Sequence, residues 1–444
     1  DEIWQERPEF KPSNAFLLEE KYSGKSADEK IKEVTQRFEG EYLLIAEPLS
    51  ICWLLNIRGK DLPHTPVLFC YAIVTKKGEV YLYSYRNAIG DELKEQLSGK
   101  IFYKNIKNIF KDLPLTANSR VTVDFNETPR AFISELENSN VEIIKSDNPC
   151  KILKAVKNET ERQNIRKAHI KDGAAVTKFL FWVEQAVENN EYIDETDCAE
   201  KLLEFRSQNE GFICPSFGTI AGYKENGAII HYQPNKASCK RVEKGGILLV
   251  DSGGQYLEGT TDITRTIFLG EPNEEQKRNF TLVLKGHIAI ALAKLPKGSN
   301  GIMLDSMARQ YLWREGKDYA HGTGHGVGHV LNVHEGPQNI SKRGNQELLA
   351  GMILSNEPGY YKEGEYGIRI ENLIAINEIE GTNFIGVENL SLSPIDLNLI
   401  DFEMLNKDEK DWINNYHQEV YEKISPFLDP TEKEMLSNKT SKIN

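Results

Sequence analysis

The sequence predicts a mixed helix and sheet protein (α/β, or α+β) built from two domains. Its 444 residues exceed the length at which one hydrophobic core usually stops growing. Its composition, 39% hydrophobic and 27% charged, is that of an ordinary folded protein. Strand-like and helical segments alternate up to about Cys150, and from Pro215 to Asn372 glycine turns separate further strand-like runs.

The first domain is predicted for residues 16–155, after a polar linker at residues 1–15 that contains two prolines. Its first helix begins after Ser26, because Ser26 and Glu29 have the spacing of a capping box. Strands are expected at residues 41–47, 67–74, 80–84 and 121–125, with the second and third joined as a hairpin, and helices at residues 91–97 and 130–138. This domain carries no obvious chemistry.

The second domain is predicted for residues 156–400. Apolar residues recur at helical spacing over residues 152–189, which predicts one long helix at its start. His169 on that helix is expected to cap or pack rather than to catalyse. Another helix is expected near residues 199–209, followed by the strands and glycine turns that hold all candidate ligands.

The end of the chain, residues 401–444, is predicted to be a helical extension. An amphipathic helix is expected from Lys407 onward. The tail from Thr431 is polar enough that we expect it to be mobile.

Charge and composition exclude several classes of partner. A net charge of −13 argues against a nucleic-acid-binding protein, because such affinity comes from clustered Lys and Arg. The longest apolar stretches, residues 67–74 and 247–250, are the size of buried strands and too short to cross a membrane. The six cysteines are scattered without a CxxC, which is typical of reduced thiols. We therefore expect a cytoplasmic protein with no nucleic-acid or membrane partner.

Candidate metal ligands gather in short segments of the second half of the chain. They are Asp251, Asp262, His325, Glu357 and Glu371. Each stands at a strand end, on an alternating strand or in a glycine-rich loop, where backbone can approach a small ion closely. Four carboxylates and one imidazole are too acidic for a structural zinc site and suit one or two divalent ions of the manganese, cobalt or iron type. The residues therefore indicate a two-metal hydrolase.

The spacing of the acids predicts two hairpins. Asp251 and Asp262 are far enough apart for a glycine turn and a returning strand, and so are Glu357 and Glu371. For any single acid, a solvated turn position is the better interpretation. That interpretation fails for the set, because Asp251 ends an apolar run and Glu371 follows two isoleucines on a strand-like segment, where an unpaired carboxylate is costly. Paired acids in apolar strands need a cation.

Histidines and one arginine surround these acids in the sequence. His321, His325, His329 and His334 place four of the nine histidines in one glycine-rich loop. A lone histidine more often packs than binds, whereas such a cluster favours function, and the surplus imidazoles could hold substrate or stabilise a developing oxyanion. Arg369 stands two residues before Glu371 and could orient that carboxylate or a substrate group. An ordinary surface salt bridge is the alternative for Arg369.

These segments resemble the metal-binding core of the Xaa-Pro aminopeptidases (aminopeptidase P), particularly the long form. The resemblance lies in VDSGGQYLEGTTDITRT, HGTGHGVGHVLNVHEGP and SNEPGYYKEGEYGIRIENL, and ENGAIIHYQP and WLLNIRG extend it over essentially the whole chain. It implies a pita-bread metallopeptidase catalytic domain preceded by a creatinase-like α/β domain. The long form carries another domain ahead of the segment at which this chain starts, so the chain is either naturally shorter or trimmed.

The resemblance also implies a cofactor and a role for each site residue. It implies two divalent ions, Mn²⁺ by family expectation, with Co²⁺, Fe²⁺ or Zn²⁺ as other candidates, and a hydroxide between them as the nucleophile. The implied ligands are Asp251, Asp262, His325, Glu357 and Glu371, with Asp262 reaching both ions and Glu371 bridging them. Glu357 is the implied proton shuttle, His231 and His334 bind substrate and polarise the carbonyl, and His321, Tyr361 and Arg369 receive the proline ring.

The implied activity is release of the N-terminal residue from peptides with proline in second position. An Xaa-Pro bond is a tertiary amide, and its secondary-amine leaving group must be protonated. Peptides with an Xaa-Pro N-terminus are the implied partners, and a homodimer is the family expectation.

Four alternatives remain beside this prediction. Prolidase shares the five ligands but accepts only dipeptides, and methionine aminopeptidase fits less well because the first domain is large. A metal-free pita-bread module that binds peptides, or creatinase-like chemistry without metal, would have lost ligands, and none is lost here.

Overall fold

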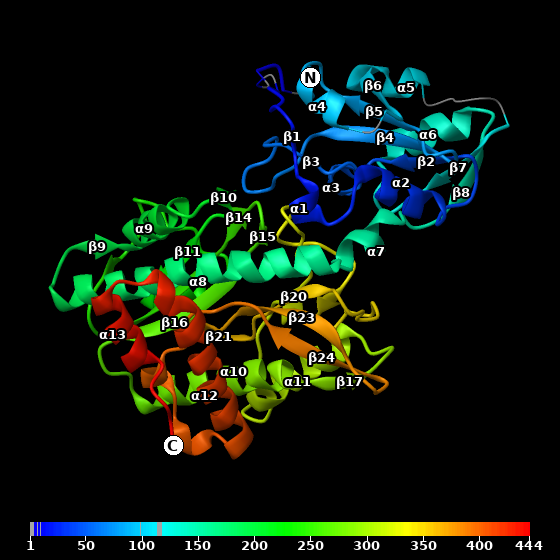
Figure 1. Cartoon of the computed structure of the whole chain (residues 1–444). Coiled ribbons are helices and arrows are strands. Elements are labelled where there is room, and N and C mark those ends of the chain that lie inside the picture. The colour runs from blue at the N-terminus through cyan, green and yellow to red at the C-terminus, as the bar shows by residue number, and fades with distance from the viewer. Residues whose placement is uncertain (1–3, 7, 9, 98, 113–117) are drawn as a thin grey trace. The chain divides into compact units, whose positions relative to one another are not determined.

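The chain divides into two units, residues 1–154 and 155–444, and Figure 1 shows the elements of each. The computed structural model describes residues 4–6, 8, 10–97, 99–112 and 118–444. Of the predicted linker at residues 1–15, residues 1–3, 7 and 9 lie outside the described residues.

The first unit contains a six-stranded mixed sheet in the order β6-β5-β4-β2-β7-β8. The strands are β2 (Tyr42–Ile45), β4 (Cys70–Thr75), β5 (Val80–Ser84), β6 (Ile101–Asn105), β7 (Arg120–Val123) and β8 (Glu142–Lys145). β4 pairs antiparallel with β2 and β5, and the other neighbours are parallel. A separate pair is formed by β1 (Phe16–Leu17) and β3 (Ile57–Arg58). The predicted strands and the hairpin are confirmed.

Side-chain caps mark the start of only some helices in the described part of this unit. They are α1 (Glu20–Ser23), α2 (Ala27–Thr35), α3 (Pro48–Leu54), α4 (Asp91–Gln96), α5 (Ile109–Asp112), α6 (Arg130–Asn138) and α7 (Cys150–Ala155). The Ser26 and Glu29 capping box is present at the start of α2, as predicted. α6 buries Phe132 and Leu136 against the sheet, in a core shared with β2, β4 and β7.

The second unit contains two main sheets together with several smaller strand sets. The first sheet has the order β11-β13-β16, and all its pairings are antiparallel. Its elements are β11 (Ile220–Tyr223), β13 (Gly246–Ser252) and β16 (Ile263–Leu269), with α8 (Glu159–Glu188) and α9 (Glu195–Ser207). α8 and α9 share one hydrophobic core with this sheet. Every residue of β13 and β16 is buried, which agrees with the apolar run of residues 247–250 in β13.

The second sheet has the order β17-β24-β23-β20 and is also antiparallel. Its elements are β17 (Lys294–Pro296), β20 (Ile353–Asn356), β23 (Asn372–Ile379) and β24 (Phe384–Asn389), with α10 (Glu274–Ala291) and α11 (Gly301–Trp313). The smaller strand sets are β9 (Ile193–Asp194) with β12 (Arg241–Val242), β10 (Phe212–Pro215) with β14 (Gly254–Tyr256) and β15 (Gly259–Thr260), β18 (Gly324–His325) with β19 (Asn339–Ile340), and β21 (Gly359–Lys362) with β22 (Tyr366–Arg369).

The structure corrects the predicted start of the long helix. Residues 152–189 do not form one helix, because α7 ends at Ala155 and α8 begins after Asn158. Asn158 and Glu161 form a capping box there, with the Asn158 side chain accepting from Glu161 N at 3.0 Å. His169 packs as predicted, since it is 2% exposed and its Nδ1 lies 2.8 Å from Ile165 O.

The C-terminal tail is also more ordered than its composition predicts. The expected amphipathic helix is α12 (Lys407–Ile424). Composition predicts a mobile tail from Thr431, but residues 431–439 belong to α13 (Pro430–Lys439), which starts at a capping box formed by Asp429 and Glu432. Lys439 Nζ lies 2.6 Å from Glu184 Oε1 on α8, so an ion pair holds this last helix to the unit.

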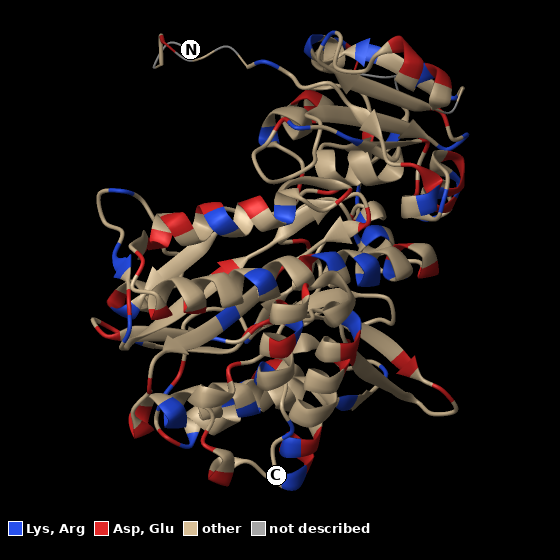
Figure 2. Ribbon diagram, turned by 60° about the vertical axis from the view of Figure 1, so that its left-hand side comes forward, with Lys and Arg blue, Asp and Glu red and all other residues tan. Residues whose placement is uncertain are grey.

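The distribution of charged residues and the lengths of the apolar stretches agree with what the composition predicts. Figure 2 shows acidic and basic positions intermixed on the helices of the second unit. Within the described part of the chain, no helix combines the length and the apolar character that crossing a membrane requires.

A buried ion pair joins α8, α9 and β14. Arg206 Nε and Nη2 donate to the two carboxylate oxygens of Asp172 at 2.8 and 3.0 Å, and Tyr256 Oη donates to Oδ1 at 2.8 Å. Burial alone would raise the pKa of Asp172, but Arg206 and Tyr256 hold that pKa below its ordinary value. Asp172 and Arg206 are 2% and 1% exposed, so neither can exchange its partner for water.

We expect Asp172→Ala to lower the free energy of unfolding by about 3–5 kcal/mol, because it leaves the Arg206 charge buried without a partner. Denaturant unfolding measures this change. Asp411→Ala is the control, since it breaks an exposed pair with Lys407 and should cost less than about 1 kcal/mol. Equal costs for the two variants would contradict this account.

Candidate metal centre

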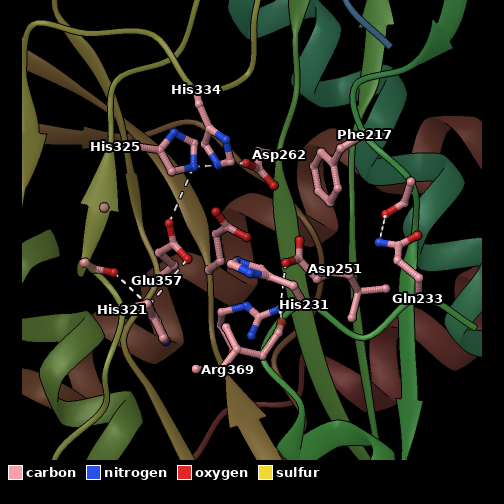
Figure 3. Close-up of a pocket in the computed structure, with 16 residues that line it drawn as sticks. Phe217, His231, Gln233, Asp251, Asp262, His321, His325, His334, Glu357 and Arg369 are labelled. Carbon is pink, nitrogen blue, oxygen red and sulfur yellow. Dashed lines mark hydrogen bonds and ion pairs between the residues drawn. The ribbon is translucent and has the colours of Figure 1, made fainter. Parts of the chain in front are cut away.

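The five predicted ligands line one cavity of about 500 Å³ in the second unit (Figure 3). His231, His321, His334 and Arg369 line the same cavity. His329 does not, since its ring is 2% exposed and its Nε2 lies 3.0 Å from Glu258 O. Three of the four clustered histidines therefore reach the site.

Two hairpin connections bring the four acids together, as predicted. Asp251 lies on β13 opposite Thr264 of β16, and Asp262 immediately precedes β16. Glu357 directly follows β20, and Glu371 directly precedes β23. Because the last residue of β20 pairs with the first of β23, both glutamates leave the sheet at the same end. The β21 and β22 hairpin spans the gap between them.

The histidine loop is attached to the same strands by hydrogen bonds. Glu357 N donates to Thr323 O at 2.8 Å, and His325 N donates to Ser355 Oγ at 2.9 Å. His325 Nε2 consequently lies 3.4 Å from both Asp262 Oδ2 and Glu357 Oε1. Asp262, His325 and Glu371 each offer one donor atom, and these atoms all lie within 4.8 Å of one another. That spacing suits a shared metal ion.

The chemistry of the donor set fits divalent cations. Burial, and then the charge of Asp251, raise the pKa of Asp262 well above its ordinary value, and burial followed by Asp262 does the same to Glu371. Burial also raises the pKa of Glu357, although His325 and Arg369 oppose it. Among the described residues, Asp251 Oδ1 and Asp262 Oδ1 are buried without a hydrogen-bond partner. Carboxylates so placed repel one another unless cations lie between them.

Arg369 pairs with a different acid from the one its spacing predicts. Its Nη2 donates to Asp251 Oδ2 at 2.6 Å and does not orient Glu371 directly. The link to Glu371 runs through Thr264, which lies 3.3 Å from Arg369 Nε and donates to Glu371 Oε2 at 2.7 Å. Of the two roles expected for Arg369, direct orientation of Glu371 is wrong, because β22 ends at Arg369 and strand alternation does not continue to Glu371. At 1% exposure, Arg369 is no surface salt bridge.

His321, Tyr361 and Arg369 form a chain of hydrogen bonds along one wall. His321 Nδ1 lies 2.7 Å from Gly322 O, which can only accept, so Nδ1 carries the proton and Nε2 accepts from Tyr361 Oη at 2.8 Å. Tyr361 Oη in turn accepts from Arg369 Nη1 at 2.6 Å. Burial lowers the pKa of His321 to about 3, so its ring is neutral at neutral pH.

His334 stands beside a ligand candidate on the other side of the cavity. Its ring is nearly perpendicular to that of His325, with centroids 4.1 Å apart. Desolvation of the ring, and then His325, lower the pKa of His334 to about 4. A neutral imidazole can accept or donate one hydrogen bond without adding charge to the centre.

Comparisons with known proteins agree with this geometry. The family model for metallopeptidase family M24 matches residues 163–378, that for the creatinase/prolidase N-terminal domain matches residues 6–161, and that for the C-terminal region of peptidase M24 matches residues 383–443. A protein named probable Xaa-Pro aminopeptidase P from Laccaria bicolor is 40% identical over 447 residues, covering 96% of this chain and 69% of that protein. The chain belongs to the Xaa-Pro aminopeptidase P family of M24 metallopeptidases.

Solved structures place the fold in the same family. The crystal structure of the X-prolyl aminopeptidase from Caenorhabditis elegans, a cytosolic enzyme with a di-nuclear active site, superposes with a TM-score of 0.94 at 30% identity, covering 100% of this chain and 75% of that one. A prolidase from Pyrococcus horikoshii matches with a TM-score of 0.66 at 26% identity, covering 84% of this chain and 99% of that one. The predicted family, the creatinase-like and pita-bread folds and the metallo-aminopeptidase class are confirmed.

Sequence reasoning missed several residues of the site. Thr264 and Ser355 each bond a proposed glutamate ligand, and Ser355 Oγ donates to Glu357 Oε1 at 2.9 Å. Each stands two residues from a proposed ligand, a spacing that strand alternation could have used. The cavity wall opposite His325 carries Phe217 and Gln233, as Figure 3 shows. Nothing in the sequence near Phe217 marks it as part of a site, whereas Gln233 stands two residues after the candidate His231 in the segment ENGAIIHYQP.

Removing metal should make stability depend on pH. The folded pKa values of Asp262, Glu357 and Glu371 are raised, so the folded chain binds more protons than the unfolded chain. The free energy of unfolding that these three carboxyls contribute is fully present below their ordinary pKa. It is lost as the pH rises through their raised folded-state pKa values. We expect the Tm of metal-free protein to fall between about pH 5 and 8, and added Mn²⁺ to reverse the fall.

Thermal unfolding in chelator, with and without Mn²⁺, measures this effect. Glu371→Gln is the matched control, because it removes one of the repelling charges and should flatten the pH dependence. A metal-free parent protein whose Tm is flat or rises over this range would contradict the account.

Proposed function

We propose that this chain releases the N-terminal residue from peptides with proline in second position. The observation that carries the proposal is the gathering of the five acidic and imidazole donors with the His321, Tyr361 and Arg369 wall in one cavity. The name of the Laccaria bicolor relative supports the substrate class. Prolidase is the second candidate, supported by the likeness to the Pyrococcus horikoshii enzyme.

The proposed cofactor is a pair of divalent ions, with Mn²⁺ preferred over Co²⁺, Fe²⁺ or Zn²⁺. Asp251 and Asp262 would hold one ion, His325 and Glu357 would complete the other, and Asp262 and Glu371 would reach both. When bound, such ions lower the pKa of a water molecule and polarise a carbonyl oxygen. The di-nuclear active site of the Caenorhabditis elegans enzyme supports a pair.

Glu357 is the proposed proton shuttle. Burial raises its pKa, which brings this carboxyl nearer to the pH at which it can both accept and release a proton. Ser355 fixes Oε1, while Oε2 lies 3.9 Å from His321 Nδ1 on the proline-side wall. From this position Glu357 can deliver a proton to the prolyl nitrogen, which must be protonated to leave as a secondary amine.

His231 and His334 are the proposed substrate histidines. Both line the cavity, and the low pKa of His334 keeps that ring neutral where the enzyme would work. A neutral ring can donate its single N–H to a substrate carbonyl as negative charge develops there. His321, Tyr361 and Arg369 are the proposed wall for the proline ring.

We also propose the organisation of the chain around this activity. Residues 1–15 form a linker, 16–155 the creatinase-like domain, 156–400 the catalytic domain and 401–444 a helical extension. A homodimer and a cytoplasmic location are further proposals, and the cytosolic character of the Caenorhabditis elegans enzyme supports the location.

The substrate assignment is tested with Arg-Pro-Pro and Ala-Pro, using chelated protein before and after Mn²⁺ is added back. We expect Mn²⁺-dependent release of arginine from the tripeptide and much slower cleavage of the dipeptide. A strong preference for Ala-Pro would assign prolidase activity. Silence on both peptides with metal bound would favour a non-catalytic peptide-binding module.

The role of His334 is tested by His334→Ala. We expect kcat to fall by about 100-fold or more, with Mn²⁺ content near that of the parent, because the ring would act on substrate. Metal analysis and steady-state kinetics measure the two effects. His325→Ala is the comparison and should lose metal. Loss of metal in His334→Ala as well would reassign that histidine as a ligand.

A further inference from the structure

A group of contacts outside the cavity joins α10 to the ends of β20 and β23, next to Glu357 and Glu371. His287 of α10 is 0% exposed and does not line the cavity. Its Nδ1 lies 3.1 Å from Asn356 O, and Asn356 Nδ2 donates to His287 O at 2.9 Å. Its Nε2 lies 3.3 Å from Asn372 Nδ2. One histidine therefore contacts both Asn356 and Asn372.

The partners fix the protonation of this ring. Asn356 O can only accept, so His287 Nδ1 carries the proton, and Nε2 is free to accept from the Asn372 amide. Burial, and then the charge of Arg265, lower the pKa of His287 to about 3. The ring is thus a neutral, oriented connector in which each nitrogen has a partner.

The two asparagines occupy the positions that matter for the acids. Asn356 ends β20 and Asn372 begins β23, and they are register partners in the sheet. Glu357 follows the first and Glu371 precedes the second, so a shift of either strand end would move a carboxylate. Both asparagines are 0% exposed, and no water can replace a lost partner cheaply.

The side-chain amide of Asn372 makes hydrogen bonds through both its nitrogen and its oxygen, and these hold the start of β23. Its Nδ2 donates to Asn389 Oδ1 at 2.7 Å as well as to His287, and its Oδ1 accepts from Arg265 Nη2 at 2.8 Å. Arg265 also donates to Glu371 O at 2.7 Å through Nη1. The Glu371 carbonyl and the Asn372 side chain are therefore both held by Arg265.

Two aromatic residues of helix α12 contact His287 and Arg265. The ring of Trp412 meets His287 edge-on, with centroids 5.7 Å apart, and stacks on Tyr416 at 5.1 Å and 2°. Tyr416 Oη accepts from Arg265 Nη2 at 2.7 Å. Contacts thus run from Asn356 through His287, Trp412 and Tyr416 to Arg265 and back to Glu371.

We propose that His287 is a positioning residue of the metal centre. It ties the ends of β20 and β23 together through Asn356 and Asn372, and so sets the separation of the Glu357 and Glu371 carboxylates. The proposal rests on the ligand roles proposed above for those two glutamates. It assigns to α12, in the C-terminal region of the chain, the task of keeping this connector in place.

The test compares two buried histidines: His287, which contacts α12, and His417, which is part of α12. His287→Phe keeps an aromatic ring against Trp412 but removes both side-chain hydrogen bonds. His417→Phe is the matched control, because His417 is 1% exposed, has its pKa lowered to about 3 by burial, and accepts from Ile395 N at 3.1 Å without contacting Asn356 or Asn372. Glu371→Ala serves as a benchmark for loss of a ligand.

Each protein is stripped with chelator and titrated with Mn²⁺ by calorimetry, and the Co²⁺ forms are compared by visible absorption. We expect His287→Phe to weaken metal binding by about 10- to 100-fold and to alter the Co²⁺ spectrum, as supporting residues of metal sites do. His417→Phe should bind metal as the parent does, even where its metal-free Tm is lowered as much. If His287→Phe does not fold, Trp412→Leu, which withdraws the supporting ring, should weaken binding in the same direction.

Two outcomes would overturn the proposal while leaving the metal centre intact. One is parent-like Mn²⁺ affinity and Co²⁺ spectrum in His287→Phe, or in Trp412→Leu where that variant replaces it. The other is an equal loss of affinity in His287→Phe and His417→Phe, which would mean general destabilisation. Parent-like metal binding in Glu371→Ala would instead overturn the ligand assignment itself, and the proposed function with it.

Discussion

Mutual repulsion among four clustered carboxylates is the constraint on which the rest of this structure depends. Two of them, Asp262 and Glu371, are 4% and 1% exposed, and burial followed by the charges of neighbouring acids raises the pKa of both. Side chains free to move would turn away from such a cluster. They are kept in it by backbone pairing, because Asp251 is in register with Thr264 and Glu371 N donates to Thr264 O at 3.2 Å. Folding therefore places the charges, and cations offset the cost.

Neutral groups and one arginine complete the balance of charge. Arg369 offsets Asp251, while Thr264 and Ser355 satisfy carboxylate oxygens without adding charge. His321, His334 and His287, in or next to this centre, have lowered pKa values, and burial is the first cause in each. Protonated rings would compete with metal ions for the carboxylates. Burial of the imidazoles and burial of the acids are thus two parts of one arrangement, which keeps the acids available for cations.

The sequence indicates the proposed ligands better than the residues that support them. Five acids and imidazoles in glycine-rich and strand-end segments carry a chemical pattern, and capping boxes such as Ser26 with Glu29 carry a local one. The Asn158 and Glu161 box would have corrected the start of α8, since it too is local. By contrast, Arg369 lies 118 positions from its partner Asp251, and His287 lies 85 positions from Asn372. Such pairings depend on tertiary packing, which periodicity and spacing do not encode.

Under the proposed roles, Arg369 would link the geometry of the metal site to substrate selection. One part of its guanidinium holds Asp251, and another holds Tyr361, which orders His321. A flexible cavity wall could adapt to many substrate residues. The wall formed by His321, Tyr361 and Arg369 is instead fixed at one end, because Arg369 is bonded to the proposed metal ligand Asp251. A five-membered ring is itself rigid, so a rigid wall can match it without a large loss of side-chain entropy on binding. If these proposed roles hold, a substitution in the wall formed by His321, Tyr361 and Arg369 should also change metal binding through Asp251, so that selectivity and metal binding would be properties of one hydrogen-bonded unit.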